Sequence, residues 1–446
     1  MRISKLFGSR VVAKNASYAG SGDYVNSYYA YSANPAPERP ALTDAVETDV
    51  CVVGAGYSGL SAAITLAEKG YRVVMLEGAK VGWGASGRNG GQIVNGLNAS
   101  LQSIAKRYGE DKAKFVAGVV QEGGEIIRDR VKRYDIACDL KDNNIFAALN
   151  GRHMRELEER IAVWEGYGLR NQELLSRDQM REHVGSDLYV GGAIDRSGGH
   201  MHPLNLALGE AAALESLGGV IYEHSPAVKV DDSGPTPVVE TPQGKVSCKT
   251  LVLCGNAYLG SVVPTLAWRV MPVSTQVMAT KPLGDNLAAS LLPTDACVED
   301  VRYILDYYRL SADKRLLFGG GTVYGGADPS DIKAKLMGNL VKVFPALKDV
   351  QIDFAWSGNF ALSFTRVPQL GRIGDNTYFA QGYSGHGVVG SHLFGRILGE
   401  AIDGDSSRFD VFAGLPWVPF PGGRMFRVPY STIGSWWYAL RDRLGV

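Results

Sequence analysis

The stretch TDVCVVGAGYSGLSAAITLAEKGYRVVMLEGAKVGWGASGRNGGQ, residues 48–92, decides the fold of this chain. An apolar run at residues 50–53 predicts a buried parallel strand, and the GAGYSG turn at 54–59 leads directly into an apolar helical pattern. A second apolar run at 73–76 ends in Glu77. Strand, glycine turn, helix, strand and acid follow one another in the order of a dinucleotide-binding unit.

Each residue type in this unit has a physical reason. Gly54 allows the tight turn, Gly56 lets backbone amides approach a pyrophosphate, and Gly59 lets the helix pack on the strand. Glu77 follows Gly54 by 23 positions, close to the ~20 expected of the acid that binds a ribose diol. Tyr57, Ser58 and Gly78 complete the predicted site. An ordinary glycine-rich turn is the alternative, but the surrounding strand, helix and acid favour dinucleotide binding.

Composition limits the class of protein. The chain has 446 residues, enough for two domains, with 45% hydrophobic and 21% charged residues, as in globular proteins. Lys+Arg 46 equals Asp+Glu 46, so no basic surface for nucleic acid is expected. Its 55 glycines exceed average usage and gather in predicted loops, which favours close approach of the backbone to a large ligand.

Cysteines and hydropathy indicate the compartment. The five cysteines are scattered and show no CxxC spacing, so we expect free thiols, no metal site and the reducing cytoplasm. The basic start MRISKLFGSR lacks the continuous apolar segment of a secretory signal, and no apolar run of ~18 residues is long enough to span a membrane.

The remaining sequence alternates helical and strand patterns. Helices are predicted as one or two within residues 100–134, and at 152–167, 204–217, 330–344 and from the GYSGHG loop at 382–387 onward. Strands are predicted at 145–148, 188–194, 219–222, 227–230, 251–254 and 378–380, and antiparallel ones at 273–280, 302–310 and 315–320. The segment GGHMHP at 198–203 predicts a turn.

Three glycine-rich blocks carry a resemblance to a known family. The unit at 54–77, GASGRNGG at 84–91 and GYSGHG at 382–387 resemble the D-amino-acid-oxidase superfamily of FAD enzymes. Within it, the chain is similar to the bacterial gamma-glutamylputrescine oxidases from about residue 20 onward. The matching stretches include SYYAYSAN (27–34), EGGEIIRDR (122–130), SGGHMHPLNLALGEA (197–211), GNAYLG (255–260), LDYYRLSAD (305–313), GGGTVYG (319–325), FPGGR (420–424) and LRDRLGV (440–446).

The resemblance implies an α/β fold in which a Rossmann-like FAD-binding domain joins a substrate domain with a mostly antiparallel sheet. The polar composition of residues 1–47, rich in Ser, Tyr, Ala and Pro, predicts an extended N-terminal arm that lies over the core, with its first residues disordered. The FAD-binding domain would comprise residues 48–135, 197–265 and 346–446 with a C-terminal tail, and the substrate domain residues 136–196 and 266–345.

It also implies cofactor positions beyond the first motif. Those expected to bind FAD are Ala85, Ser86, Gly87, Arg88, Asn89, Gly90, Gly91, Gln92, Val228, Cys254, Gly255, Gly385, His386, Gly387 and Val388. Arg88 has the alternative of a surface charge, Val228 of a buried strand residue and His386 of a helix cap. Related enzymes attach FAD through a late cysteine. This chain has none after Cys297, so we expect non-covalent FAD.

The implied reaction is oxidation of the primary amine of gamma-glutamylputrescine by O2 to an aldehyde, ammonia and hydrogen peroxide, in putrescine breakdown. His386, His202, Tyr307 and Asp306 are candidates to steer or deprotonate the amine, and each has the alternative of a structural hydrogen-bonding role. Amino-acid-oxidising relatives place a cation after the GHG motif to bind the substrate carboxylate. Here Val388 and Val389 follow, which suits an amine whose carboxylate is distant.

Two further alternatives stay open. One is a dehydrogenase of the same superfamily that passes electrons to a quinone or carrier, and the other is a catalytically silent FAD-binding subunit. A reductase using NAD(P)H is disfavoured because a second GxGxxG is absent from the sequence. The oligomeric state is left open. The C-terminal residues Ile433, Trp436, Trp437 and Leu440 share one helical face, which we expect to pack on the protein, with a membrane surface as the alternative.

Overall fold

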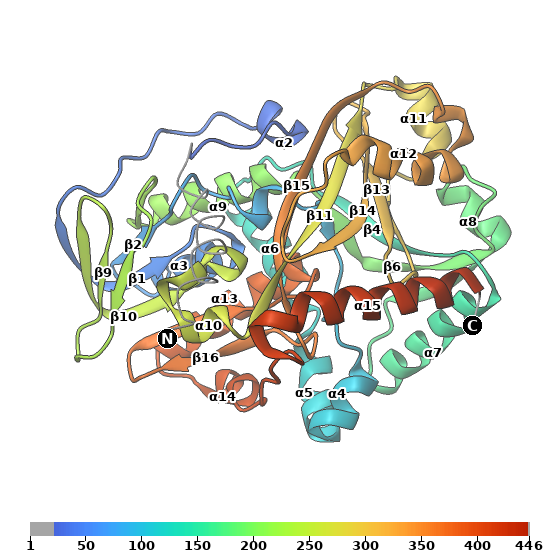
Figure 1. The fold of residues 1–446 in the computed structure, drawn as a ribbon. Coiled ribbons are helices and arrows are strands. Elements are labelled where there is room, and N and C mark those ends of the chain that lie inside the picture. The colour runs from blue at the N-terminus through green and yellow to red at the C-terminus, as the bar shows by residue number, and fades with distance from the viewer. Residues whose placement is uncertain (1–21, 445–446) are drawn as a thin grey trace, which may run out of the picture.

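The computed structural model describes residues 22–444, apart from the side chains of Ser261, Arg424, Ala439 and residues 441–444. The expected disorder of the first residues lies outside this range. Two sheets stand side by side, each with its own helices, and the arm and the last helix lie across them (Figure 1).

The first sheet contains the predicted dinucleotide unit. Its strands run in the order β16-β17-β10-β1-β2-β7, parallel from β17 to β7. They are β1 (Ala45–Val53), β2 (Val73–Leu76), β7 (Val220–Tyr222), β10 (Lys245–Leu253), β16 (Gln369–Ile373) and β17 (Thr377–Gln381), with β8 (Lys229–Asp231) and β9 (Val238–Glu240) as a ribbon beside β10. Segments distant in sequence therefore build one sheet.

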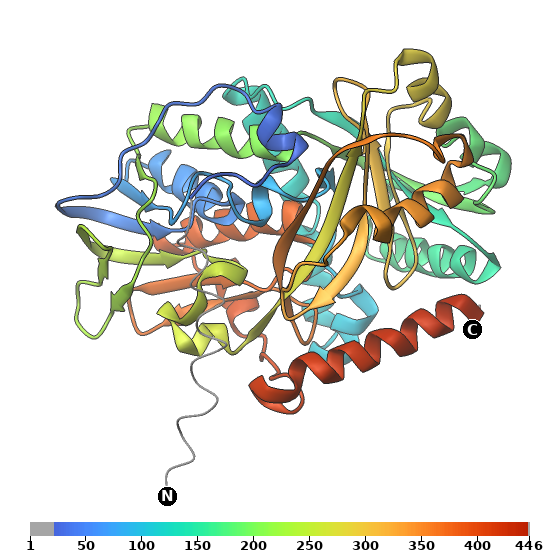
Figure 2. The same ribbon diagram turned by 45° about the horizontal axis from the view of Figure 1, so that its top comes forward.

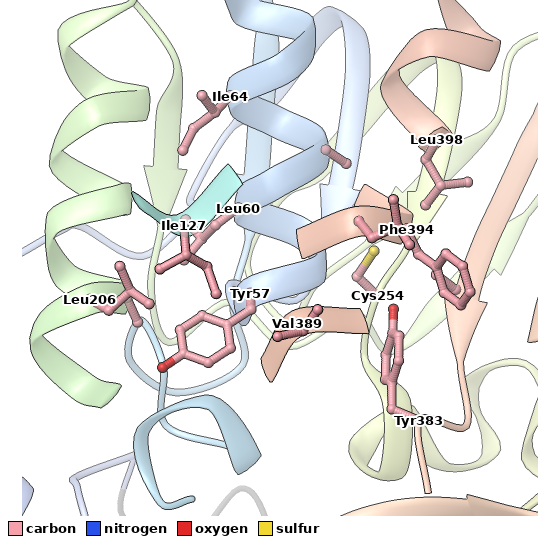
Figure 3. Close-up of a cluster of buried hydrophobic side chains, with 14 of the residues drawn as sticks. Tyr57, Leu60, Ile64, Ile127, Leu206, Cys254, Tyr383, Val389, Phe394 and Leu398 are labelled. Carbon is pink, nitrogen blue, oxygen red and sulfur yellow. The ribbon is translucent and has the colours of Figure 1, made fainter. Parts of the chain in front are cut away.

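Helices cover this sheet with apolar side chains. They are α3 (Tyr57–Ala67), α6 (Glu122–Arg133), α9 (Pro203–Ser216) and α13 (Gly387–Ile402). Leu60 and Ile64 of α3, Leu206 of α9 and Phe394 of α13 belong to one buried cluster, shown in Figure 3. Every residue of α3 is buried, which explains why its sequence contains no charged side chain. This packing fixes the start of α3, where the glycine turn lies.

The second sheet is mostly antiparallel, in the order β15-β11-β14-β13-β12-β4-β6-β3 with β5 on β6, and only β12 and β4 pair in parallel. Its strands are β3 (Gln92–Ile93), β4 (Lys141–Ala148), β5 (Gln172–Ser176), β6 (Gly191–His200), β11 (Val270–Thr280), β12 (Cys297–Asp300), β13 (Asp306–Leu310), β14 (Leu316–Tyr324) and β15 (Ile352–Ser363). The fold class predicted from the sequence is confirmed.

Several boundaries differ from the prediction. Residues 100–134 form three helices, α4 (Leu101–Tyr108), α5 (Glu110–Val119) and α6, because Gly109 has a φ of 96° and ends α4. The predicted turn at 198–203 is wrong in its first half, since β6 continues to His200 through pairing with β4. β15 pairs with β11, so residues 352–363 belong to the second sheet and not to the last FAD-binding segment.

Most of the other helices lie around the second sheet, and the last of them packs against β16 of the first sheet (Figure 1). They are α7 (Gly151–Gly166), α8 (Arg177–His183), α10 (Pro264–Ala267), α11 (Asp285–Leu291), α12 (Ile332–Val343) and α14 (Ser407–Ala413). α12 packs against the second sheet through buried Leu336, Leu340 and Val343.

The N-terminal arm joins the two halves of the molecule. It crosses the top of the first sheet and reaches β15 through α2 (Tyr28–Tyr31), as Figure 1 shows. Tyr29 is fully buried, and its hydroxyl accepts a hydrogen bond of 3.1 Å from Arg309 of β13. Arg39 lies on the other side and forms an ion pair of 2.6 Å with Glu215 at the end of α9. The arm is therefore part of the folded core.

The last helix, α15 (Gly423–Leu444), stands against the outside of the molecule (Figure 2). Our expectation that its apolar face packs on the protein is wrong, because Trp436 is 68% exposed and Trp437 61%. Ile433 and Leu440 are exposed too, whereas Ser435 on the opposite side is buried. Within residues 22–444, no helix combines the length and hydropathy required to cross a bilayer.

Candidate functional site

A cavity of about 610 Å³ is lined by residues of both sheets and of the loops at their ends. Its volume lies within the ~300–1,000 Å³ typical of pockets for cofactors and small ligands. One part is bounded by the glycine turn before α3, and the other by β12, β13, β14 and the loop before α13. The cavity thus joins the predicted dinucleotide unit to the predicted substrate domain.

The glycine turn has the geometry that its sequence predicts. Gly54 has a φ of 104°, and a Cβ there would lie 2.9 Å from the carbonyl oxygen of Cys254. A Cβ on Gly59 would lie 2.0 Å from the carbonyl oxygen of Gly54, so α3 approaches the turn this closely only with glycine. Gly56 is the N-cap residue of α3 and provides no side-chain cap. The N–H of Tyr57 donates to the Ser86 hydroxyl over 3.0 Å, and the helix start with Gly56, Tyr57 and Ser58 lines the cavity, where a helix N-terminus favours an anion.

Glu77 lies at the end of β2, buried on the cavity wall. One carboxylate oxygen accepts a hydrogen bond of 2.8 Å from the N–H of Ala55, and the other accepts one of 3.0 Å from the N–H of Ala79. These two backbone bonds hold the carboxylate in one orientation. The geometry suits an acceptor for a ribose diol.

The loop after Gly84 runs from the turn toward the second sheet. Asn89 organises it, because its side-chain amide donates to the carbonyl oxygens of Ala85 and Ser86 and its oxygen accepts from the N–H of Gly91. The Arg88 guanidinium lies 4.0 Å from the centre of the Trp83 ring and donates to the Trp83 carbonyl, so this arginine is not a free surface charge.

Two glycines of this loop allow close contact with the second sheet. A Cβ on Gly90 would lie 2.5 Å from the Tyr307 ring, and one on Gly91 would lie 2.3 Å from the carbonyl oxygen of Met201. Arg309 donates to the carbonyl oxygen of Gly90 over 2.6 Å. The loop is therefore clamped beneath the cavity with its backbone close to any flat ligand above it, which fits an isoalloxazine ring.

The loop before α13 forms the opposite wall. Gly385, Gly387 and Val388 line the cavity with His386. His386 is the N-cap residue of α13, yet its side chain makes no capping hydrogen bond, which argues against the helix-cap alternative. Desolvation by the surrounding protein, helped by the charge of Arg160, lowers the pKa of His386 to about 4. The imidazole is therefore neutral near pH 7.

The cavity collects most of the predicted site residues and leaves some outside. Its lining includes Gly54, Gly56, Tyr57, Ser58, Glu77, Ala85, Ser86, Arg88, Asn89, Gly90, Gln92, Cys254, Gly255, Tyr307, Gly385, His386, Gly387 and Val388. Outside the lining lie Gly59, Gly78, Gly87, Gly91, Val228, His202 and Asp306. Gly59, Gly87 and Gly91 are needed for close backbone contacts beneath the cavity.

Val228 precedes β8, and its N–H donates to the carbonyl oxygen of Glu240 over 2.8 Å. Its side chain is 53% exposed, so the alternative of a buried strand valine is wrong. The ribbon of β8 and β9 projects beyond the main sheet and cannot bury both of its faces.

His202 and Asp306 are committed to structural bonds. The ring of His202 accepts from the N–H of Asn205 at the start of α9 and contacts the Ser32 hydroxyl over 3.1 Å. Asp306 forms an ion pair of 2.5 Å with Arg302 and accepts from the Asn339 amide over 3.1 Å. These contacts occupy the polar atoms that amine chemistry would need.

Sequence reasoning missed several polar side chains of the cavity wall. Glu299, Arg302, Tyr303 and Arg366 line the part formed by the second sheet. The available signal was the pair of acids in the apolar segment CVED at 297–300, which is β12. No group of three or more His, Cys, Asp or Glu suited to a metal ion occurs among residues 22–444. All five cysteines are buried and free.

Comparison with known proteins adds the family. Residues 49–401 match the family DAO, described as FAD dependent oxidoreductase. The chain is 51% identical to "Gamma-glutamylputrescine oxidoreductase" of Escherichia coli, over 95% of this chain and 100% of that protein. It is also 40% identical to "Probable oxidoreductase OrdL" of Haemophilus influenzae, over 94% of this chain and 98% of that protein.

Solved structures support the fold. Glycine oxidase from Geobacillus kaustophilus has a TM-score of 0.67 and 21% identity, covering 82% of this chain and 97% of that one. L-proline dehydrogenase from P. horikoshii has a TM-score of 0.69 and 18% identity, covering 82% of this chain and 96% of that one. At these identities the likeness concerns the fold alone.

Proposed function

The chain belongs to the DAO family of FAD-dependent oxidoreductases, and we propose that it oxidises the terminal primary amine of gamma-glutamylputrescine. The observation that carries the substrate is the 51% identity to the Escherichia coli gamma-glutamylputrescine oxidoreductase over that protein's whole length. The proposed net reaction converts the amine, O2 and water into gamma-glutamyl-aminobutyraldehyde, ammonia and hydrogen peroxide. Five free thiols fit a reducing compartment, so we place this reaction in the cytoplasm.

FAD is the cofactor of this family, and the cavity has the groups to hold it. The N–H groups at the start of α3 suit the pyrophosphate, Glu77 suits the ribose, and the loop at residues 85–92 suits the isoalloxazine ring. When bound, FAD accepts a hydride equivalent from the carbon bonded to the amine. We propose that it is held without a covalent bond. Cys254 is the cysteine of the lining, and burial raises the pKa of its thiol to about 12, so the thiol stays protonated.

The polar groups of the wall suit the two ends of this substrate. Val388 and the buried Val389 follow the GHG motif where a cation would bind a carboxylate next to the reacting carbon. Arg302 and Arg366 line the other part of the cavity, and Arg366 donates to the Tyr303 hydroxyl over 3.0 Å. Arg302 is already paired with Asp300 and Asp306, so we propose that Arg366 attracts the distant glutamyl carboxylate while the amine enters toward Tyr307 and His386.

Anaerobic mixing of the purified yellow protein with gamma-glutamylputrescine, putrescine and sarcosine in turn tests this function. We expect the glutamylated amine to bleach the flavin band far faster than the other two, with one peroxide per flavin after air is admitted. Bleaching by sarcosine alone would overturn the substrate. Bleaching by no amine would favour the catalytically silent subunit.

A quinone is the second candidate acceptor, and α15 is the observation that favours it. Tyr438 of α15 stacks on Tyr303 of the cavity wall, with ring centres 4.5 Å apart. The exposed Trp436 and Trp437 therefore lie on a helix at the edge of the cavity. An amphipathic helix with an aromatic face binds at a bilayer surface, where quinones dissolve. Bleaching without peroxide, and reoxidation by ubiquinone in phosphatidylglycerol vesicles, would select this acceptor.

A further inference from the structure

Glu299 is the carboxylate of the cavity wall that the protein itself leaves without a bonding partner. Its side chain is on β12, only 8% exposed, and it lines the cavity. It forms no hydrogen bond or ion pair with any residue between 22 and 444 whose side chain the structure describes. The neighbouring Asp300, in contrast, is bound by Arg302 over 2.5 Å.

A carboxylate without a hydrogen-bond donor destabilises the protein when no ligand is bound, and it indicates the charge of the ligand that would bind beside it. Partial loss of hydration disfavours the charged carboxylate of Glu299, and among the described residues the charge of Arg160, rather than a hydrogen-bond donor, opposes this effect. Burial raises the pKa of Glu299 to about 7, Asp300 adds to this, and Arg160 opposes it. Arg160 of α7 lies over the Phe146 ring at 4.0 Å and interacts with Glu299 through its charge, without a hydrogen bond or ion pair between them. A cationic ligand is what completes this environment.

The strand register places Glu299 on the reacting side of the cavity. Glu299 lies directly opposite Tyr307 in the antiparallel pairing of β12 with β13, so both side chains project to the same face of the sheet. The Tyr307 ring contacts Gly90 of the loop that suits the isoalloxazine. Glu299, Tyr307 and His386 all line this one cavity.

We propose that Glu299 binds the substrate ammonium and accepts one proton from it, which leaves the neutral amine that oxidation requires. The inference rests on the proposed function. In this step an N–H bond of R–CH2–NH3+ breaks and an O–H bond forms on the carboxylate, giving R–CH2–NH2 and a carboxylic acid. No electrons are transferred. Glu299 thus takes the role for which the sequence offered His202 and Asp306, whose polar atoms are already bound.

The groups around Glu299 are identified for a pH experiment. Arg160 comes from α7, and Asp300 with its partner Arg302 from β12 and the turn after it. Tyr307 comes from β13, and burial raises the pKa of its phenol. Cys297 lies on the same strand and its thiol pKa is raised as well, while His386 is neutral near pH 7. Glu299 is therefore the group in this set expected to titrate near neutrality.

The test compares wild type with E299Q, E299D and the exposed control E182Q in the FAD-loaded enzyme. Anaerobic flavin reduction by gamma-glutamylputrescine is followed from pH 5.5 to 9. In wild type and E182Q, the rate of flavin reduction should fall as the pH drops below an apparent pKa near 7. E299Q should reduce its flavin about 100-fold more slowly or worse, as expected for loss of a general base, and its rate should not show this acidic decrease, the limb of the pH profile. E299D should recover part of the rate and restore the limb.

A second readout uses ligands that are not oxidised. One is the gamma-glutamyl amide of a diamine with two methyl groups on its amine-bearing carbon, and the other is gamma-glutamyl-n-butylamide. Each dissociation constant is measured from the shift of the flavin spectrum. E299Q should bind the ammonium ligand at least 10-fold more weakly than wild type, with no loss for the butylamide. Flavin content and circular dichroism verify that each variant is folded, and E299D covers a failure of E299Q.

An E299Q enzyme with the wild-type pH limb and unchanged affinity for the ammonium ligand would overturn the proposal for Glu299 and leave the proposed function intact. If another primary amine reduces wild type in place of gamma-glutamylputrescine, the substrate assignment fails. The rates of the four proteins are then compared with that amine. If no amine reduces wild type and the ammonium ligand does not bind, both proposals fail.

Discussion

Single glycines decide whether the cofactor site can form. The sequence located Gly59 by its spacing, and the coordinates supply the reason, since its α-hydrogen faces the Gly54 carbonyl oxygen where a Cβ would lie at 2.0 Å. The side chains of the cavity wall were harder to predict from the sequence. Glu299 and Arg366 are separated by 67 positions, and only the pairing of distant strands brings such residues to one cavity. The spacing of a motif predicts the local geometry of the backbone, but it does not predict contacts between residues that are distant in the sequence.

A Gly59→Ala variant is expected to lose FAD. The clash is with backbone, so α3 must move away from the turn, at a cost above the ~1–3 kcal/mol of ordinary overpacking. Flavin absorbance per protein after gel filtration measures the loss. Gly338→Ala is the matched control, because its Cβ in α12 meets nothing within 4 Å. This control should keep its flavin, and its free energy of unfolding should rise by up to ~1 kcal/mol. Full flavin content in Gly59→Ala would contradict the packing argument.

His200 should make the fold sensitive to acid. Burial, with Arg309 adding, lowers the pKa of this fully buried imidazole to about 3. Below its ordinary pKa of 6.5 the unfolded chain binds a proton that the native state refuses. The free energy of unfolding therefore falls by up to ~1.4 kcal/mol per pH unit as the pH drops from 6.5 toward 3. Urea unfolding at pH 7, 6 and 5 should show a shallower dependence in His200→Gln. An identical slope would exclude His200 as the cause.

At the scale of elements, the periodicity of apolar residues predicted which helices and strands exist better than it predicted where they begin and end. The helix at 152–167 and the strand at 378–380 were found almost as α7 and β17, because each has a clear apolar pattern between breakers. β12 was missed because two of its four residues are acids, of which Glu299 lines a cavity and Asp300 pairs with Arg302. The exposed face of α15 was misjudged because an amphipathic pattern identifies an apolar face without saying what covers it.

The helix α15 should be separable from the cofactor site. No residue of α15 belongs to the cavity lining among the residues that the structure describes. A chain ending at Pro421 is expected to retain its FAD and to elute earlier from a phenyl column in falling salt, because Trp436 and Trp437 are removed. Flavin content and retention are the measurements. Loss of FAD on truncation would show that α15 stabilises the cavity through Tyr303.

At the scale of the whole molecule, one buried ionic cluster joins three helices. Glu210 of α9 forms an ion pair of 3.0 Å with Arg130 of α6 and lies 3.2 Å from His392 of α13. All three side chains are buried. Burial opposes ionisation of Glu210, but His392 and Arg130 outweigh it and its pKa is lowered. Sequence patterns do not reveal this cluster, because its members are far apart in the chain.

Glu210→Gln is expected to lower the free energy of unfolding by ~3–5 kcal/mol, because Arg130 would keep a buried charge without its counterion. Guanidinium unfolding at pH 7 measures this. Glu173→Gln removes the exposed pair with Arg196 and should change stability by less than ~1 kcal/mol. Since the Glu210 pKa is lowered, its stabilisation should be present at neutral pH and be lost as the pH falls below the ordinary glutamate range. Equal effects in both variants would show that burial is irrelevant here.

Because the first sheet is built from segments distant in the sequence, it cannot be completed until late in the synthesis of the chain. β1 is paired on one side by β10, and β10 in turn by β17, which is made roughly 300 residues after β1. At ~5–20 residues per second, the first strand waits about 15–60 s for the sheet to be completed. Until then residues 251–253 of β10 lack their β17 partner in the nascent chain, and the wall that contains His386 does not exist. Flavin capture is therefore a late event that follows synthesis of nearly the entire chain.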